Sequence, residues 1–455
     1  MKHSIAFLFL CAALPAAAQT TAVFENVNVI PMDRERVLER QHVVVRDGRI
    51  AEVGPASRVK IPDGALRIRG EGKYLVPGLA EMHGHLPGPT VPPQFTETVL
   101  FLYVANGVTT VRGMLGNPAN LELRKRIAAG AVLGPTLYVA GPSFGAQSAA
   151  SPEQARRMVI EQKQAGYDHL KIQEGLRRDV YDAIAAAAGE VGIRFAGHVP
   201  NDVGVERAIE ARQASIDHLD GYLEALEPPD SPLRTSDAKA RAARLASVLD
   251  ERRIRALARA TREAGIWVVP TMALWETFYS DATGEALREK MPELKYLPQS
   301  MVDGWVQSKT ARMAEGNIMG FRPGGDSGAR VIELRRRMLR ALRDEGARIA
   351  LGTDSPQLFS VPGFSIHRET PIMVASGMTP YEVLASGTRA VAEYFGPLSD
   401  FGVIETGKRA DLILLDANPL AGVANLARRA GVMVRGRWLP ESEIQERLAK
   451  IAAAR

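Results

Sequence analysis

The central region of the chain alternates short apolar runs with amphipathic stretches. The apolar runs cover residues 74–85, 107–114, 136–141, 169–173, 194–199, 215–221, 267–274 and 348–354. Stretches with helical periodicity lie between them, at 119–129, 152–164, 179–190, 203–211, 237–264 and 329–344. Alternation of this kind predicts an α/β fold with a parallel sheet. Eight strands would close a (β/α)8 TIM barrel, whose active site lies at the C-terminal strand ends.

The two ends of the chain are β-rich. Strands are predicted at 22–24, 27–29, 42–46 and 49–53, with a hairpin turn at Asp47-Gly48. Further strands are predicted at 411–415 and 431–439, followed by a closing helix at 441–454. We therefore predict a small β-sandwich built from residues 19–73 and 396–455 around a barrel at 74–395.

One connection inside the barrel region is unusually long. Residues 275–326 exceed a plain loop and are predicted to form a lid over the site. Trp275, Phe278 and Tyr279 in this segment indicate either a partly apolar pocket or ordinary core packing.

The N-terminus has the pattern of a secretory signal peptide. Lys2 precedes an apolar stretch, and Ala16-Ala17-Ala18 forms a small-residue cleavage site, so residues 1–18 are predicted to be removed. This predicts a secreted protein of a bacterial periplasm, with no membrane contact after cleavage. Cys11 is the single cysteine of the chain, so the mature protein would have no thiol for catalysis.

Composition narrows the classes of partner. A 455-residue chain with 46% hydrophobic and 24% charged residues is typical of a globular protein with more than one structural unit. The net charge is +5 and the basic residues are scattered. Nucleic-acid binding needs a concentrated basic face, so we expect a small-molecule substrate and no nucleic-acid partner. We expect a homo-oligomer only because such assemblies are common among proteins, since no pattern in the sequence indicates an oligomeric state.

Potential metal ligands recur at the predicted strand ends. His83 and His85 flank Gly84, and residues i and i+2 of a strand share a face. Each candidate has a plain alternative on its own: a loop or core histidine, a strand-end lysine, or a helix-capping aspartate. A barrel would bring all of them into one ring, where imidazole and carboxylate suit zinc or a similar divalent ion. The set is His83, His85, Lys171, His198, His218 and Asp354.

Other polar residues have less defined roles. Arg112 and Tyr222 are candidates to bind a substrate carboxylate, with an internal salt bridge and core packing as their alternatives. His367 would either hold substrate or orient a loop. His169 is predicted to pack beneath the site, and His42 to be structural.

These residues together resemble the amidohydrolase superfamily. The resemblance rests on His-x-His in Glu81-Met82-His83-Gly84-His85, on Lys171, His198, His218 and Asp354, and on flanking motifs at 74–79 and 405–412. It is nearest to the secreted branch related to imidazolonepropionase and to prolidase-type metal-dependent dipeptidases.

The resemblance implies a two-metal site. His83, His85 and Asp354 would hold one ion, His198 and His218 the other, with Lys171 carboxylated by CO₂ between them. Imidazolonepropionase itself is a one-metal enzyme without this lysine, so Lys171 favours the dipeptidase-like side.

The expected function is hydrolysis of an amide-type carbon–nitrogen bond in a dipeptide or N-acyl amino acid. A metal-bridging hydroxide would attack the carbonyl, and Asp354 would be the catalytic proton carrier. Hydrolysis of a cyclic amide, a lactone or a phosphotriester at the same site is an alternative, as is one-metal deamination. A non-catalytic binding protein is a third reading, but it predicts lost ligand positions, whereas all six are filled.

Overall fold

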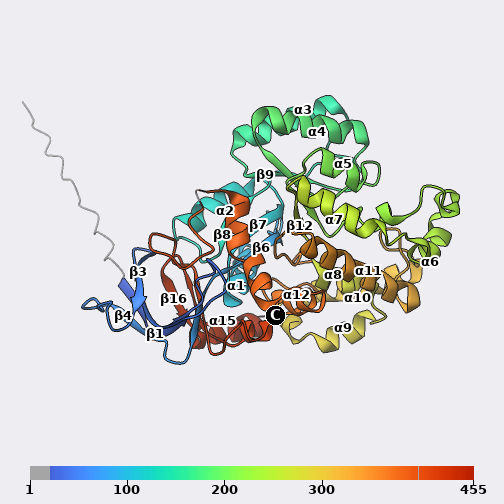
Figure 1. The fold of residues 1–455 in the computed structure, drawn as a ribbon. Helices are drawn as coiled ribbons and strands as arrows, with labels where there is room; N and C mark the ends of the chain where they lie inside the picture. Colours follow the sequence, from blue (N-terminus) through green and yellow to red (C-terminus); the bar gives the residue numbers. More distant parts are fainter. Residues whose placement is uncertain (1–20, 398, 455) are drawn as a thin grey trace, which may run out of the picture.

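The computed structural model describes residues 21–397 and 399–454, so the predicted signal peptide lies outside the described residues. Strands from both chain ends join in one mixed, eight-stranded sheet, the terminal sheet, coloured blue and red in Figure 1. Its order is β16-β15-β14-β5-β1-β2-β3, with β4 also paired to β1. The strands are β1 (Thr21–Val29), β2 (Leu38–Arg46), β3 (Arg49–Pro55), β4 (Leu66–Arg69), β5 (Tyr74–Pro77), β14 (Leu412–Leu415), β15 (Arg429–Val434) and β16 (Arg437–Pro440).

The terminal sheet is held by apolar side chains from both ends of the chain. Phe24 and Val43 share one buried cluster with Leu412 and Met433. The predicted hairpin is confirmed, since β2 and β3 pair antiparallel around Asp47 and Gly48, which have φ values of 52° and 76°.

Eight further strands form two parallel sheets in the centre of the molecule. The three-stranded sheet has the order β6-β7-β8, and the five-stranded sheet has the order β13-β12-β11-β10-β9. Single parallel bridges link the sheets at both edges, between Ala140 and His169 and between Gly84 and Ser355. The strands are β6 (Leu79–His85), β7 (Val108–Leu115), β8 (Thr136–Val139), β9 (His169–Ile172), β10 (Arg194–Gly197), β11 (Ser215–Asp217), β12 (Trp267–Val269) and β13 (Arg348–Ile349).

Helices connect successive strands and lie around the two parallel sheets (Figure 1). Local sequence sets their ends, as in α3, where the Ser151 side chain accepts a hydrogen bond from the Gln154 N–H and Gly166 ends the helix at φ 84°. The helices that precede β11 are α1 (Pro93–Ala105), α2 (Ala119–Ala128), α3 (Pro152–Ala165), α4 (Arg178–Val191) and α5 (Gly204–Glu210). The helices that follow β11, apart from α8 to α10 described below, are α6 (Ala238–Val248), α7 (Arg253–Glu263), α11 (Gly325–Asp344), α12 (Ile366–Ala375), α13 (Pro380–Ser386), α14 (Arg389–Phe395) and α15 (Glu441–Ala453).

Several predicted elements need correction, among them the strands predicted at 215–221 and 348–354, which end at Asp217 and Ile349. The strand predicted at 74–85 is divided at Gly78, where the chain passes from the terminal sheet (β5) into the first parallel strand (β6). The strand predicted at 267–274 ends at Val269, because Pro270 has no N–H and Thr271 takes a φ of 45° before a helix begins. The helix predicted at 237–264 is two helices, α6 and α7.

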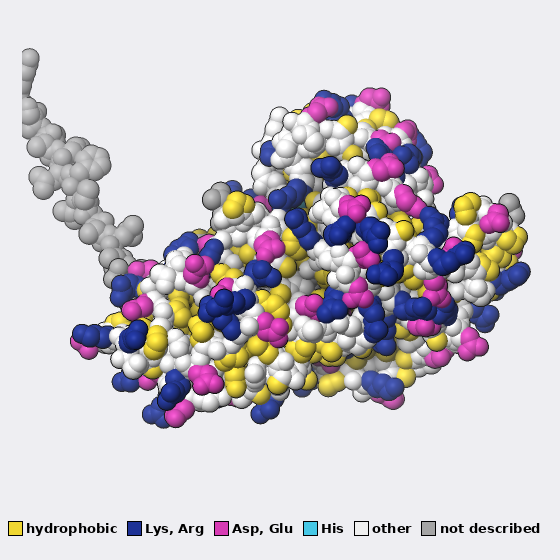
Figure 2. Space-filling view, in the orientation of Figure 1, with side chains coloured by type: hydrophobic (Ala, Val, Ile, Leu, Met, Phe, Trp, Pro, Cys, Tyr) yellow, Lys and Arg dark blue, Asp and Glu magenta, His cyan; other side chains and the backbone are white. Residues whose placement is uncertain are grey.

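The segment 275–326, predicted as a lid, is largely helical. It contains most of α8 (Met272–Tyr279), then α9 (Gly284–Lys290), the short 3₁₀ helix η3 (Pro292–Tyr296) and α10 (Gln299–Glu315). None of the helices in the described ranges is both long and apolar enough to cross a membrane. Basic and acidic side chains are interspersed over the face shown in Figure 2.

Candidate active site

Three buried side chains from different strand ends meet at one point. His83 lies in β6, His218 directly follows β11, and Asp354 lies beyond β13. Each offers one potential ligand atom, and these atoms lie within 4.8 Å of one another. Because all three are buried, the cluster is shielded from bulk water.

His85 and Lys171 join this cluster. His85 Nε2 lies 3.0 Å from Asp354 Oδ1, and Lys171 Nζ lies 3.0 Å from His83 Nε2. Burial lowers the pKa of Lys171 to about 8, although Asp217 and Asp354 act in the opposite direction. Its amine therefore loses its charge more readily than that of a surface lysine.

His198 lies on the more exposed side of the cluster. Its ring centroid is 4.7 Å from that of His218 and 6.4 Å from that of His83. Its Nδ1 lies 2.7 Å from Asp220 Oδ2 and 3.5 Å from Glu174 Oε1. The structure thus brings all six predicted ligand positions into one group.

A hydrogen bond fixes the orientation of each of three histidine rings. His83 Nδ1 lies 2.7 Å from Asp217 Oδ2, and His218 Nδ1 lies 2.8 Å from Thr271 Oγ1. His198 uses Nδ1 in the same way, with Asp220. Each ring therefore keeps Nε2 for another partner, an arrangement typical of metal-binding histidines.

Backbone conformation also aims the site residues. His218, Thr271 and Asp354 have φ values of 63°, 45° and 57°, in the left-handed region that residues other than glycine seldom adopt. Such conformations cost energy and cluster at functional sites.

The donor set fits a divalent cation. Burial, followed by neighbouring positive charge, holds the pKa of His83 and of His218 well below the usual value, so both imidazoles are neutral as metal binding requires. Among the described residues, His218 Nε2 is buried without a hydrogen-bond partner, and Asp354 Oδ1 has the His85 ring 3.0 Å away. An unpaired buried polar atom is costly, and a cation would satisfy His218 Nε2 while also binding the Asp354 carboxylate.

Sequence reasoning missed a buried carboxylate beneath the cluster. Glu81 accepts hydrogen bonds from the N–H groups of His83 and Thr353 at 2.9 and 2.7 Å, and from Thr353 Oγ1 at 2.5 Å. Burial raises the pKa of Glu81 to about 7. Glu81 thereby ties β6 to the segment that carries Asp354. A glutamate inside an otherwise apolar strand was the available signal.

Arg112 does not face a substrate. Its side chain is fully buried and donates to Met82 O, Ser215 Oγ, Tyr394 OH and both carboxylate oxygens of Asp217. This contradicts the predicted substrate contact, because protein groups already occupy the guanidinium. The structure instead contains the internal ion pair with Asp217, which was the alternative predicted for Arg112.

Tyr222 and His367 likewise do not take the substrate-binding positions predicted for them. Tyr222 is buried with its hydroxyl 2.7 Å from Thr261 Oγ1, so it is part of the core. His367 Nε2 lies 3.1 Å from Asn106 Oδ1 and 3.4 Å from an Arg429 nitrogen, at a contact between α12 and the terminal sheet. Neither meets the histidine cluster.

The other two histidines of the described ranges take structural positions. His169 is buried, and burial lowers its pKa to about 3. His42 Nδ1 accepts a hydrogen bond from the Asn26 N–H at 3.0 Å.

Helix α8 covers one side of the cluster and is held at both ends. Trp275 on this helix lies 6.0 Å from the His218 ring, centroid to centroid. The buried Glu369 carboxylate accepts from the N–H groups of Met272 and Ala273 at 2.8 and 2.6 Å. At the other end, Lys309 Nζ donates to Thr277 O, Phe278 O and Ser280 O, each at 2.9 Å.

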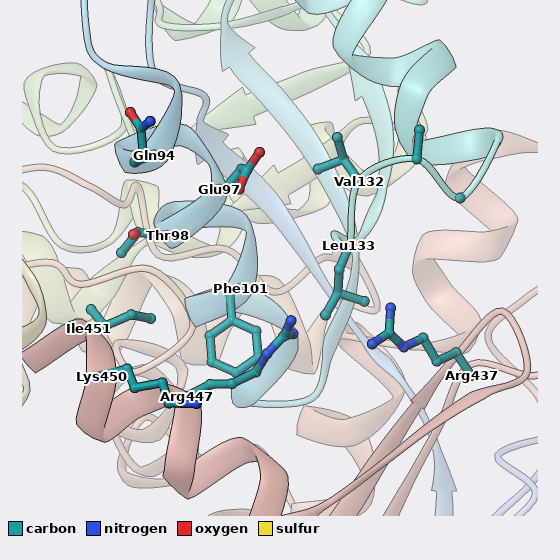
Figure 3. Close-up of a pocket in the computed structure, with 12 residues that line it drawn as sticks. Gln94, Glu97, Thr98, Phe101, Val132, Leu133, Arg437, Arg447, Lys450 and Ile451 are labelled. Atoms are coloured by element: carbon teal, nitrogen blue, oxygen red, sulfur yellow. The ribbon is translucent and has the colours of Figure 1, made fainter.

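A cavity elsewhere in the molecule contains none of the six predicted metal ligands. It measures about 440 Å³ and lies between α1 and α15, where Phe101, Arg447 and Arg437 are among the lining residues (Figure 3). Its cations are surface side chains, and we assign it no role in the site.

Comparison with known proteins identifies the family of the chain. The model of the Amidohydrolase family matches residues 74–439. An imidazolonepropionase of Shouchella clausii is 40% identical over 83 residues, a stretch that is 17% of this chain and 17% of that enzyme.

Solved structures share the fold at low identity. A bottromycin amidohydrolase aligns with a TM-score of 0.71 and 24% identity, over 95% of this chain and 90% of the other. A Xaa-Pro dipeptidase with methionine bound in its active site aligns with a TM-score of 0.64 and 20% identity, over 92% of this chain and 100% of the other.

Buried histidine and carboxylate side chains thus converge at the strand ends of an α/β fold. The chain belongs to the amidohydrolase family, as its sequence motifs predicted.

Proposed function

We propose that the protein hydrolyses an amide-type carbon–nitrogen bond in a dipeptide or an N-acyl amino acid, with two divalent metal ions at the strand ends of a closed (β/α)8 barrel. The observation that carries this proposal is the convergence of His83, His218 and Asp354 on one point, with Lys171 in contact. The bridges that link the two parallel sheets at both edges support the barrel. The terminal sheet would correspond to the predicted β-sandwich.

The cluster offers ligands for two ions. His83, His85 and Asp354 would hold one, and His198 and His218 the other. Lys171 Nζ contacts His83 of the first group, and its lowered pKa supplies the neutral amine that CO₂ requires. Addition would form a bond from Nζ to the carbon of CO₂ and release one proton, which would turn the amine into an anionic carbamate, a further ligand for the ions.

Bound ions would supply a water of lowered pKa and a polarised carbonyl. The protein groups then have defined tasks. Asp354, whose carboxylate is buried in the cluster, would accept a proton from the attacking water and pass it to the leaving nitrogen. Asp217 and Thr271 would keep the His83 and His218 rings in place.

The substrate class is supported from two sides. Lys171 is present, as the dipeptidase-like reading requires, and a Xaa-Pro dipeptidase is among the proteins of similar fold. The 83-residue similarity to an imidazolonepropionase favours a second candidate, hydrolysis of a cyclic amide.

The test combines metal analysis with a substrate panel. We expect about two divalent ions per chain, zinc being the leading candidate, and turnover of dipeptides or N-acyl amino acids that chelation abolishes. Lys171→Ala is expected to lose one ion and most activity, whereas the surface variant Lys163→Ala keeps both. One ion per wild-type chain, with turnover of cyclic amides alone, would contradict the proposal.

Secretion is a separate proposal. We propose that residues 1–18 direct the chain to the periplasm and are removed there. N-terminal sequencing of the protein from its native compartment is expected to begin at Gln19, and an intact Met1 would contradict it.

A further inference from the structure

The Glu81 side chain lies between two backbone hydrogen bonds that join β6 to the chain beyond β13. Met82 N–H donates to Leu351 O at 2.9 Å, and His85 N–H donates to Ser355 O at 2.8 Å. The pairing of β6 with β7, on its other side, shifts register twice over the same residues, between Glu81 and His85. Register shifts interrupt a ladder locally, so backbone pairing alone holds this part of β6 less firmly than a regular strand.

One oxygen of Glu81 binds both segments at this irregular point. Oε1 accepts from His83 N–H at 2.9 Å and from Thr353 N–H at 2.7 Å. The second oxygen accepts from Thr353 Oγ1 at 2.5 Å, and the side chain is fully buried. An acceptor shared by two N–H groups keeps both groups within hydrogen-bond distance of one atom, and so limits how far the two segments can separate.

The chain leaves room for this carboxylate at Gly352. A Cβ atom at that position would lie 3.1 Å from Glu81 Oε1 and 3.0 Å from His83 N, closer than such contacts normally are. The close approach of the two segments therefore depends on a glycine directly before Thr353.

The residues held in this way flank three of the candidate metal ligands. His83 and His85 lie on the β6 side, and Asp354 lies between Thr353 and Ser355 on the other. Within the described chain, the hydrogen bonds of the Glu81 side chain go to His83 and Thr353. The other two histidine ligands follow different strands, His198 after β10 and His218 after β11.

We propose that Glu81 is a positioning residue for one of the two metal ions. The ion held by His83, His85 and Asp354 depends on it, whereas the ion held by His198 and His218 does not. This inference rests on the proposed two-metal function and deepens it, because it gives the two ions different supports. The role belongs to the hydrogen bonds, so an amide of the same shape should replace the carboxylate.

Calorimetric titration of the metal-free protein with zinc tests the proposal. In Glu81→Ala one of the two ions is expected to bind about 10- to 100-fold more weakly, while the other keeps its wild-type affinity. Glu81→Gln should keep both affinities within about threefold of wild type. Its amide oxygen can accept from both N–H groups, and its NH₂ group can donate to Thr353 Oγ1.

Hydrogen–deuterium exchange of the metal-free protein gives a readout that does not depend on the ions. In Glu81→Ala the peptides that contain His83 and Thr353 should exchange at least about tenfold faster than in wild type, because both N–H groups lose their acceptor. In Glu81→Gln they should exchange at the wild-type rate.

Asp411→Ala is the matched control, because Asp411 is a buried carboxylate that also accepts a backbone N–H, from Arg435 at 2.7 Å, beside β14 of the terminal sheet. This variant should lower the free energy of unfolding and leave both zinc affinities unchanged.

Equal weakening of both ions in Glu81→Ala, or weakening of either ion in Asp411→Ala, would overturn the positioning role. Unchanged exchange in Glu81→Ala, or a Glu81→Gln variant as impaired as Glu81→Ala, would overturn it as well. Fewer than two ions in wild type would contradict the two-metal function alone, and the exchange rates would then decide the role of Glu81.

Discussion

Replacing Asp217 by asparagine tests the internal support of the site. The Asp217 carboxylate contacts His83 Nδ1 at 2.7 Å, Arg112 Nη2 at 3.0 Å and Ser215 Oγ at 2.6 Å, and it is fully buried. Asparagine keeps the shape but replaces one acceptor oxygen by a donor and removes the charge. Arg112 then becomes a buried cation without a counter-ion.

The contacts set the expected magnitude. Breaking a buried ion pair from one side costs about 3–5 kcal/mol. Arg112 retains its hydrogen bonds to Met82 O, Ser215 Oγ and Tyr394 OH, so we expect the lower end, a loss of about 3 kcal/mol in the free energy of unfolding. The freed His83 ring should also weaken metal affinity, by about 10- to 100-fold.

Urea unfolding of the metal-free protein measures the first effect, and metal titration measures the second. Asp179→Asn is the matched control, since Asp179 pairs with Arg177 at the surface, and it should leave the free energy of unfolding close to that of wild type. The double variant Arg112→Met/Asp217→Asn removes both charges and should be more stable than the sum of the single effects implies.

Unfolding of Asp217→Asn within about 1 kcal/mol of wild type, or a double variant that loses the simple sum of both single effects, would contradict a stabilising buried ion pair. Reduced stability with unchanged metal affinity would support the buried ion pair of Asp217 with Arg112. It would contradict the role of Asp217 in orienting the His83 ring.

Three other substitutions probe separate parts of the structure. Asp354→Asn should lower kcat by about 10²–10⁴-fold while the far-ultraviolet circular dichroism spectrum is unchanged, because it removes the proposed proton carrier. Lys309→Met should lower the free energy of unfolding by about 2–3 kcal/mol in urea, because three carbonyls at the end of α8 lose their donor. Burial raises the pKa of Glu369 to about 8 in the folded protein, from an ordinary 4.5. The unfolded chain therefore releases this proton at a lower pH than the folded protein does. Because of this difference, the contribution of Glu369 to stability is lost as the pH rises from about 5 to 8. Glu369→Gln should therefore show a shallower fall in unfolding free energy over that range than wild type.

Each of these expectations has a contradicting result. Full turnover by Asp354→Asn would remove the proton carrier from the mechanism. Lys309→Met should differ clearly from the exposed control Lys450→Met, and equal stability of the two would deny the clamp on α8. Equal pH slopes for Glu369→Gln and wild type would show that this carboxyl does not titrate within that range.

Sequence periodicity anticipated the parallel strands and their polar C-terminal ends. His83, His198, His218 and Asp354 could be grouped because position along a strand is a local property, and strand ends of one parallel sheet share an edge. Family motifs such as His-x-His strengthened this grouping.

The contacts that hold the site could not be predicted in this way. Asp217 binds a ring on β6, Thr271 binds a ring that follows β11, and Glu369 caps α8 from a different helix. Each contact joins residues far apart in the chain, so no local pattern specifies it. The substrate contact predicted for Arg112 was wrong for the same reason. The local sequence around an arginine in a strand is the same whether its partner is a substrate or a buried aspartate.

The pairing of β5 with β1 and β14 constrains how the protein is made. The ribosome produces β1 and β5 early, but β14 emerges only after the whole central region. Until then one edge of β5 stays open, and an open edge invites wrong pairing. Through Gly78 this strand continues into β6, which carries His83 and His85. One edge of the strand that leads into the first ligands is therefore completed last, and a nascent chain released before residue 415 lacks the β14 partner of that edge.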